Sequence, residues 1–190
     1  MTAVPPPPLL DELVPDPAYR IRAAVVVRAA PEAVWRSLLA LPMSALPVGF
    51  ALTLLRHLPD VLARTETRVR GSDTFLDATP IPVVVARPPF LLISAGPSQA
   101  WKPLGAARAP ALDADALRDW RQPGWITVAM SFALQALPDG GTRLSTETRV
   151  RATDARTARV FAPYWWLIAP ASALIRREVL RAVKRAAESG

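Results

Sequence analysis

The chain's first regular pattern is an alternation of apolar and polar positions over residues 19–28. Its odd-numbered positions are apolar up to Val27, and arginines stand at both ends of the even-numbered set. A period of two indicates a β-strand with one covered face. Pro31 and Glu32 follow, residue types that suit the first turn of a helix. We therefore expect a strand that runs into a helix, whose apolar positions at helical spacing are Val34, Leu38 and Leu41.

A hairpin and a long helix are predicted at the other end of the chain. Two alternating runs, residues 125–137 and 142–153, are separated by Pro-Asp-Gly-Gly, which is typical of a tight hairpin turn. Asp154 then precedes a helix that extends to about Glu188. Pro163 and Pro170 should kink or divide that helix. Its apolar stripe at spacings of three and four comprises Val160, Tyr164, Ile168, Ala171, Ile175, Val179, Val183 and Ala186.

Short elements are expected between these two ends. A second helical stretch covers residues 46–58, and Asp113 is a plausible N-cap for a short helix that ends at Trp120. Prolines or glycines separate several short strands, which belong at edges or bulges where no ladder hydrogen bond is lost. Their expected ranges are 65–70, 74–78, 83–86, 90–94 and 98–101. Residues 1–17 carry six prolines and are interpreted as a mobile tail before a single domain at 18–190.

The hexapeptide Thr-Glu-Thr-Arg-Val-Arg occurs twice, at residues 65–70 and again at 146–151. In a strand, its Thr and Val side chains share one face, and its Glu and Arg side chains share the other. One interpretation places Glu-Arg pairs on a solvent-facing side of the sheet. The other makes Glu147 and Arg149 a buried polar pair inside a binding pocket.

Composition limits the chemistry that the chain can perform. The apolar fraction is 51%, which favours a folded core over disorder. Cysteine is absent and His57 is the single histidine, so thiolate and multi-histidine metal sites are excluded. Three nearby aspartates, at positions 113, 115 and 119, lack the loop spacing of a calcium site. The sequence predicts no metal and no cofactor.

The net charge of +7 comes mostly from arginine, because lysine occurs only at positions 102 and 184. These charges are scattered, and we expect no nucleic-acid partner. The densest group is interpreted as the solvated face of the last helix, with Arg176, Arg177, Arg181, Lys184 and Arg185. Residues 37–55 are uncharged but are broken by Pro42 and Pro47, so two packed helices are expected and no stable membrane insertion. The first residues lack the pattern of a signal peptide, which favours a cytoplasmic location.

The order of these elements resembles the START/Bet v 1-like superfamily, also called SRPBCC or polyketide cyclase-like. The resemblance is carried by the strand 19–28 with Ala-Ala-Pro-Glu-Ala-Val-Trp at 29–35, and by residues 140–150 running into the helix that ends at 174–187. It implies an α+β helix-grip fold. In that fold an antiparallel, six- or seven-stranded curved sheet surrounds a long C-terminal helix, with two short helices after strand 1. It also implies an apolar cavity, but no particular reaction.

The expected function is non-catalytic binding of an apolar, lipid- or polyketide-like molecule between the sheet and the last helix. Apolar contact would supply the affinity, and a few polar groups would set the orientation. The predicted ligand-binding residues are Phe50, Leu54, Phe90, Trp101, Val128, Met130, Phe132, Glu147, Arg149, Tyr164 and Ile168. Two alternatives stay open: a cyclase or dehydratase that uses the same cavity, and a protein-interaction module that uses the proline-rich tail or exposed aromatics. The sequence does not determine the oligomeric state.

Overall fold

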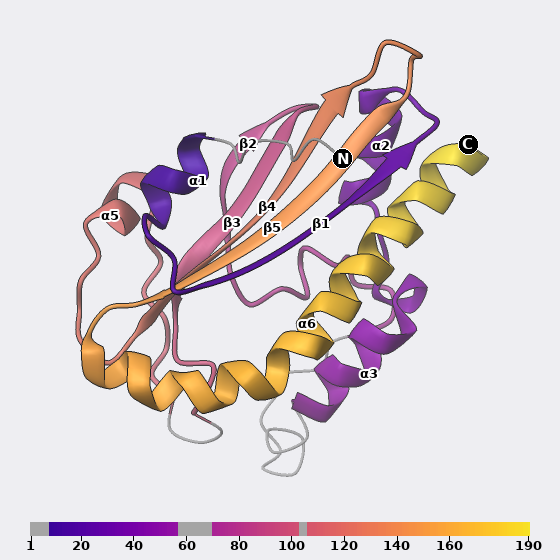
Figure 1. The fold of residues 1–190 in the computed structure, drawn as a ribbon. Coiled ribbons are helices and arrows are strands. Elements are labelled where there is room, and N and C mark those ends of the chain that lie inside the picture. The colour runs from indigo at the N-terminus through magenta and orange to yellow at the C-terminus, as the bar shows by residue number, and fades with distance from the viewer. Residues whose placement is uncertain (1–7, 57–69, 103–105) are drawn as a thin grey trace.

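The computed structural model describes residues 8–56, 70–102 and 106–190, except the side chains of Pro8 and of residues 53–56. In these ranges the strands form one antiparallel sheet in the order β1-β5-β4-β3-β2 (Figure 1). The strands are β1 (Tyr19–Val27), β2 (Val83–Arg87), β3 (Leu91–Ser98), β4 (Ile126–Ala136) and β5 (Thr142–Ala152). The helices are α1 (Pro8–Leu13), α2 (Pro31–Leu39), the 3-10 turn η1 (Met43–Ala45), α3 (Pro47–Arg56), α5 (Ala114–Arg118) and α6 (Ala155–Ser189).

The α+β helix-grip arrangement is therefore confirmed, with five described strands where six or seven are predicted. Three of the expected strand ranges do not appear as strands of their own. The range 98–101 is one of them, because β3 ends at Ser98 and residues 99–101 form no strand. Residues 65–69 lie outside the described part of the chain. Residues 74–78 form turns instead of a strand, because the Thr74 hydroxyl accepts the N–H of Asp77 and also donates to that carboxylate.

The β4–β5 hairpin forms as its sequence predicts. The two strands pair in continuous register from Ile126 opposite Ala152 to Ala136 opposite Thr142. Gly140 has a φ of +79°, which a residue with a side chain rarely adopts. The Asp139 carboxylate accepts the N–H of Gly141 at 3.1 Å, which closes the turn.

Register assigns each strand residue to one of two faces of the sheet. Ile21, Thr148, Met130 and Ser94 lie opposite one another in successive strands and so share the inner face. Their sequence neighbours Arg22, Glu147, Ser131 and Ile93 share the outer face. Helices α2, α3 and α6 lie on the inner side of the sheet, while α1 and α5 lie together on the outer side (Figure 1).

Helix α6 begins at the predicted cap and runs on as one element. The Asp154 carboxylate accepts the N–H and the hydroxyl of Thr157, at 2.8 and 2.6 Å, and the N–H of Gly124 at 2.8 Å. These bonds hold the pKa of Asp154 well below its usual range. Pro163 and Pro170 lie inside the helix without dividing it. The helix bends visibly along its length (Figure 1), as interior prolines cause.

Helix α6 also fixes the start of α3. The Glu178 carboxylate accepts the N–H groups of Val48 and Gly49 at 2.9 and 2.8 Å. These are two of the N–H groups that the first turn of a helix leaves without an internal partner. The negative carboxylate also interacts favourably with the positive, N-terminal end of the α3 dipole. The second helical stretch is therefore anchored by the last helix of the chain.

The interpretation of residues 1–17 as a mobile tail is wrong for residues 8–14. Helix α1 packs against the outer face of the sheet, and Leu10, Leu13 and Val14 are completely buried. They share a cluster with Leu91, Ile93, Ala95, Ala129 and Leu117 of α5. Burial of these side chains outweighs the extended preference of the surrounding prolines. Residues 1–7 lie outside the described part.

Among the described residues, no helix is both long enough and apolar enough to cross a bilayer.

Candidate functional site

Two separate apolar clusters cover the inner face of the sheet. We call the first the α2 cluster. It lies under α2 and the C-terminal half of α6, and its buried members include Val34, Leu38, Leu92, Phe132, Leu144, Val179 and Val183. We call the second the aromatic cluster. It lies under the N-terminal half of α6, with Ile126, Val150, Phe161 and Trp165 buried, and Tyr19, Ile21, Trp101, Val128, Tyr164 and Ile168 only partly so.

The aromatic cluster is held by ring contacts between α6 and the sheet. Tyr19 meets Phe161 edge-on with ring centroids 5.6 Å apart, and Trp165 at 4.8 Å. Trp101 also meets Phe161 edge-on at 5.6 Å. Such contacts stabilise the cluster beyond simple burial. The aromatic side chains of α6 do not all point inward, since Trp166 is 75% exposed.

A row of polar side chains lies where the two clusters meet. Thr146 and Thr148 of β5 and Ser94 of β3 all face inward by register. All three are buried. The hydroxyl oxygens of Thr148 and Ser94 have no hydrogen-bond partner among the described residues. Unpaired buried hydroxyls are unusual in a packed core, because desolvation of a polar group is unfavourable.

Arg176 of α6 completes this polar row. Its guanidinium donates to the hydroxyl of Thr146 at 3.3 Å, while its Nε is enclosed and unpaired within the described residues. No carboxylate of the described chain forms an ion pair with it. Burial lowers the pKa of Arg176 to about 10, so it stays cationic at neutral pH. We use the name polar row for Ser94, Thr146, Thr148 and Arg176.

Most of the predicted ligand-binding residues belong to, or pack against, the two clusters of the inner face. Trp101, Val128, Tyr164 and Ile168 belong to the aromatic cluster. Met130 and Phe132 belong to the α2 cluster, and Phe50 of α3 packs against it. Phe90 lies apart, in the turn between β2 and β3, and is 52% exposed. The side chain of Leu54 is outside the described part.

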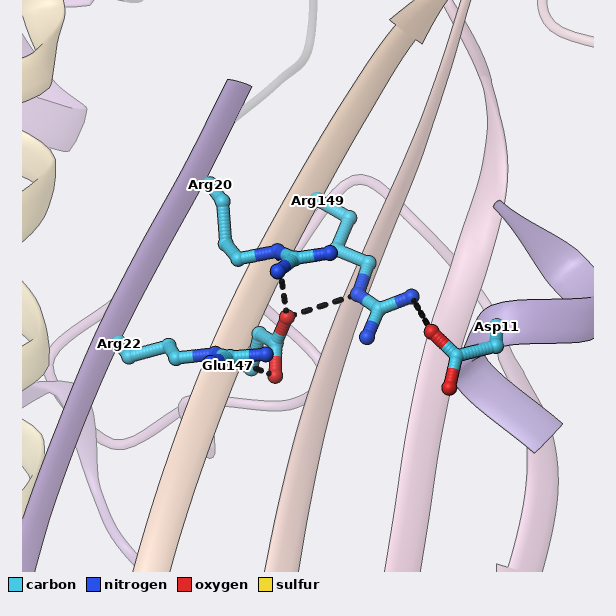
Figure 2. A network of polar contacts seen from close by, with 5 residues as sticks. All are labelled: Asp11, Arg20, Arg22, Glu147 and Arg149. Atoms are coloured by element: carbon cyan, nitrogen blue, oxygen red, sulfur yellow. Dashed lines mark hydrogen bonds and ion pairs between the residues drawn. The ribbon is translucent and has the colours of Figure 1, made fainter. Parts of the chain in front are cut away.

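The remaining predicted pair, Glu147 and Arg149, lies on the opposite face of the sheet. Glu147 accepts from Arg149 at 2.7 Å and pairs with Arg20 and Arg22 at 3.1 and 2.9 Å. Arg149 also pairs with Asp11 of α1 (Figure 2). On the Glu/Arg side of the hexapeptide's second copy, Glu147 and Arg149 are both buried and Arg151 is partly buried. Odd and even strand positions point to opposite faces, so neither residue reaches the inner site.

On the surface of the described residues, two open depressions are lined by residues other than those of the polar row. One, of about 540 Å³, lies between α2 and the last turns of α6 and includes Arg36, Ala40 and Arg185. The other, of about 530 Å³, lies beside α1 and the start of β1 and includes Asp11 and Arg20. No aromatic side chain of the described residues lines either depression.

The carboxylate side chains of the described residues mostly cap helices or form ion pairs. No group of three or more His, Asp or Glu side chains there is placed to hold a metal ion. Asp113 caps α5 by accepting the N–H of Ala116 at 2.8 Å, as its position predicts. Asp154 and Glu178 cap other helices, and no hydrogen bond joins a described carboxylate to the polar row. His57 lies outside the described residues.

Arg176 is the inner-face residue that sequence reasoning missed, because it was assigned to the solvated face of α6. Its neighbour Arg177 is exposed, as expected for that face. The spacing carries a signal, however. Arg176 stands eight positions after Ile168 and three before Val179, which places it on the apolar stripe. A charge on an apolar stripe is a better pointer to a site than a charge on a polar face.

Comparison with known proteins finds structures that are similar to this chain at low sequence identity and low TM-score. The sequence matches no family model and no curated protein. Solved structures similar to this chain include a conserved protein from Geobacillus kaustophilus, at 12% identity and a TM-score of 0.43 over 90% of this chain and 96% of that one. A hypothetical protein from Helicobacter pylori is similar at 9% identity and a TM-score of 0.42, over 97% of this chain and 96% of that one. Ara h 8.0201, a Bet v 1 family allergen, is similar at 7% identity and a TM-score of 0.34, over 90% of this chain and 99% of that one.

Proposed function

We propose that this protein is a START/Bet v 1-like binding protein that holds an apolar, lipid- or polyketide-like small molecule between the sheet and α6. One observation supports this most. The inner face is not one continuous core, and Val128, near the start of the central strand β4, is only partly buried. Protein interiors are normally close-packed, so an apolar side chain at this position favours a space that a ligand fills.

The chemistry of the surrounding residues suits an apolar ligand. Tyr19, Ile21, Val128, Tyr164 and Ile168 offer partly buried apolar surface on two sides, one from the sheet and one from α6. Each methylene that becomes buried contributes about 0.8 kcal/mol, so affinity should rise about fourfold for each added CH₂ in a ligand series. A purely protein-binding surface would not follow chain length in this way.

Matched variants on α6 test the proposal. Ile168 faces the aromatic cluster, whereas its neighbour Leu167 is 78% exposed. We expect I168W to fill the space and weaken binding of decanol at least about tenfold, and L167W to leave binding unchanged. Isothermal titration calorimetry gives the affinities, and circular dichroism checks that both variants are folded. Failure of the wild-type protein to bind decanol or its longer homologues would overturn the proposal, as would equal effects of the two substitutions.

A further inference from the structure

The polar row consists of three buried hydroxyl side chains and the partly buried Arg176, and its position on the inner face is unusual. It divides two apolar clusters on the inner face, at the level where α6 passes from one cluster to the other. Thr148 lies between Ile21 and Met130 across the sheet, and Ser94 lies on the far side of Met130. Directly opposite residues in neighbouring strands are about 5 Å apart, so the row presents several polar atoms within the span of one small ligand.

The charge balance of the row is incomplete within the described chain. Arg176 brings a positive charge to the interior, and the hydroxyl of Thr146 is the hydrogen-bond partner that it has there. A neutral hydroxyl compensates little of the free energy lost when a cation leaves water. Elsewhere in the same molecule the buried Arg149 is paired with two carboxylates, Glu147 and Asp11. Among the described residues, the partly buried Arg176 therefore lacks the carboxylate partners that compensate the completely buried Arg149.

We propose that Arg176 binds the anionic head group of the ligand, and that the protein prefers apolar molecules ending in a carboxylate or similar oxyanion. This inference rests on the proposed function. The guanidinium presents several N–H donors, and its Nε is free of any described partner. The hydroxyls of Thr148 and Ser94 are available as further donors. The ligand's apolar body would then lie against the aromatic cluster.

Two ligands and two substitutions distinguish a failure of this inference from a failure of the proposed function. Decanoate and decanol share an apolar body and differ in the charged group. R176M keeps most of the side-chain volume but removes the charge, and R177M removes the charge of the exposed neighbour. We expect the wild-type protein to bind decanoate more tightly than decanol at neutral pH. R176M should lower decanoate affinity at least about tenfold without changing decanol affinity, and R177M should change neither.

The stability of the ligand-free variants supplies a second readout. Arg176 is partly buried and has no carboxylate partner among the described residues, so replacing its charge by an apolar side chain should be neutral or stabilising. R176M should therefore unfold at the same or a higher urea concentration than the wild type. If R176M lowers stability, or changes decanoate and decanol affinities alike, Arg176 has a structural role and the inference is wrong while the proposed function stands. If neither compound binds to the wild-type protein, the proposed function itself fails.

Discussion

Asp11 of α1 and Arg149 of β5 form an ion pair across 138 positions of the sequence (Figure 2). Arg149 is completely buried, whereas the side chain of Asp11 is 57% exposed. The second partner of Arg149 is Glu147, whose side chain is only 8% exposed. Glu147 also forms ion pairs with Arg20 and Arg22. Three arginines thus share two carboxylates, and the buried carboxylate is the more important of the two.

This arrangement predicts unequal effects of removing the two carboxylates. E147Q leaves a buried guanidinium with one solvent-exposed partner, which should lower the free energy of unfolding by about 3–5 kcal/mol. D11N removes an exposed partner and should lower it by about 1 kcal/mol or less. Urea unfolding of both variants measures the difference. Equal effects would show that Asp11 is as essential to the buried arginine as Glu147.

Helix α1 should contribute to the stability of the folded domain. Leu13 is completely buried between α1 and the outer face of the sheet, whereas Leu39, the last residue of α2, is 40% exposed. We expect L13A to lower the free energy of unfolding by about 2–4 kcal/mol and L39A to lower it by less than about 1 kcal/mol. Urea unfolding provides the values. A loss from L13A no larger than that from L39A would mean that α1 is detached in solution.

The cap of α6 should make stability depend on acid pH. Hydrogen bonds from Thr157 and Gly124 lower the folded-state pKa of Asp154 below the ordinary value of 3.8. A lowered pKa gives stabilisation that is complete above the unfolded value and is lost as pH falls below it. The stability difference between the wild type and D154N should therefore be larger at pH 6 than at pH 3. T157V, which removes the largest cause of the shift, should reduce this pH dependence. A difference that is the same at both pH values would contradict the assignment.

Local signals predict much of this fold. The turn sequence around Gly140, the caps at Asp113 and Asp154 and the alternation of β1 are each decided by neighbouring residues, and each appears where the sequence places it. In the grip helix the predicted stripe brings Tyr164 and Ile168 into partial contact with the sheet. It is wrong at its start, where Val160 is 53% exposed and Phe161 and Trp165 are the buried residues.

Features decided by distant contacts were missed. Helix α1 has apolar residues at helical spacing in Leu9, Leu10, Leu13 and Val14, but the prolines around it hide this pattern. The inner or outer direction of the hexapeptide depends on the strand register, and one residue of shift would exchange the two faces. Arg176 was assigned to the solvated face because arginines surround it in sequence, although its spacing from Ile168 places it inward.

The most direct test of the central claim is methyl NMR of protein labelled at isoleucine δ1, titrated with decanoate. Ile21 and Ile168 report on the inner face beside the polar row, and Ile93 reports on the outer face under α1. A ligand between the sheet and α6 should shift the Ile21 and Ile168 signals with one saturating dissociation constant and leave Ile93 unchanged. Saturating shifts at Ile93 with none at Ile21 and Ile168 would contradict the account, because the ligand would then bind on the other side of the sheet.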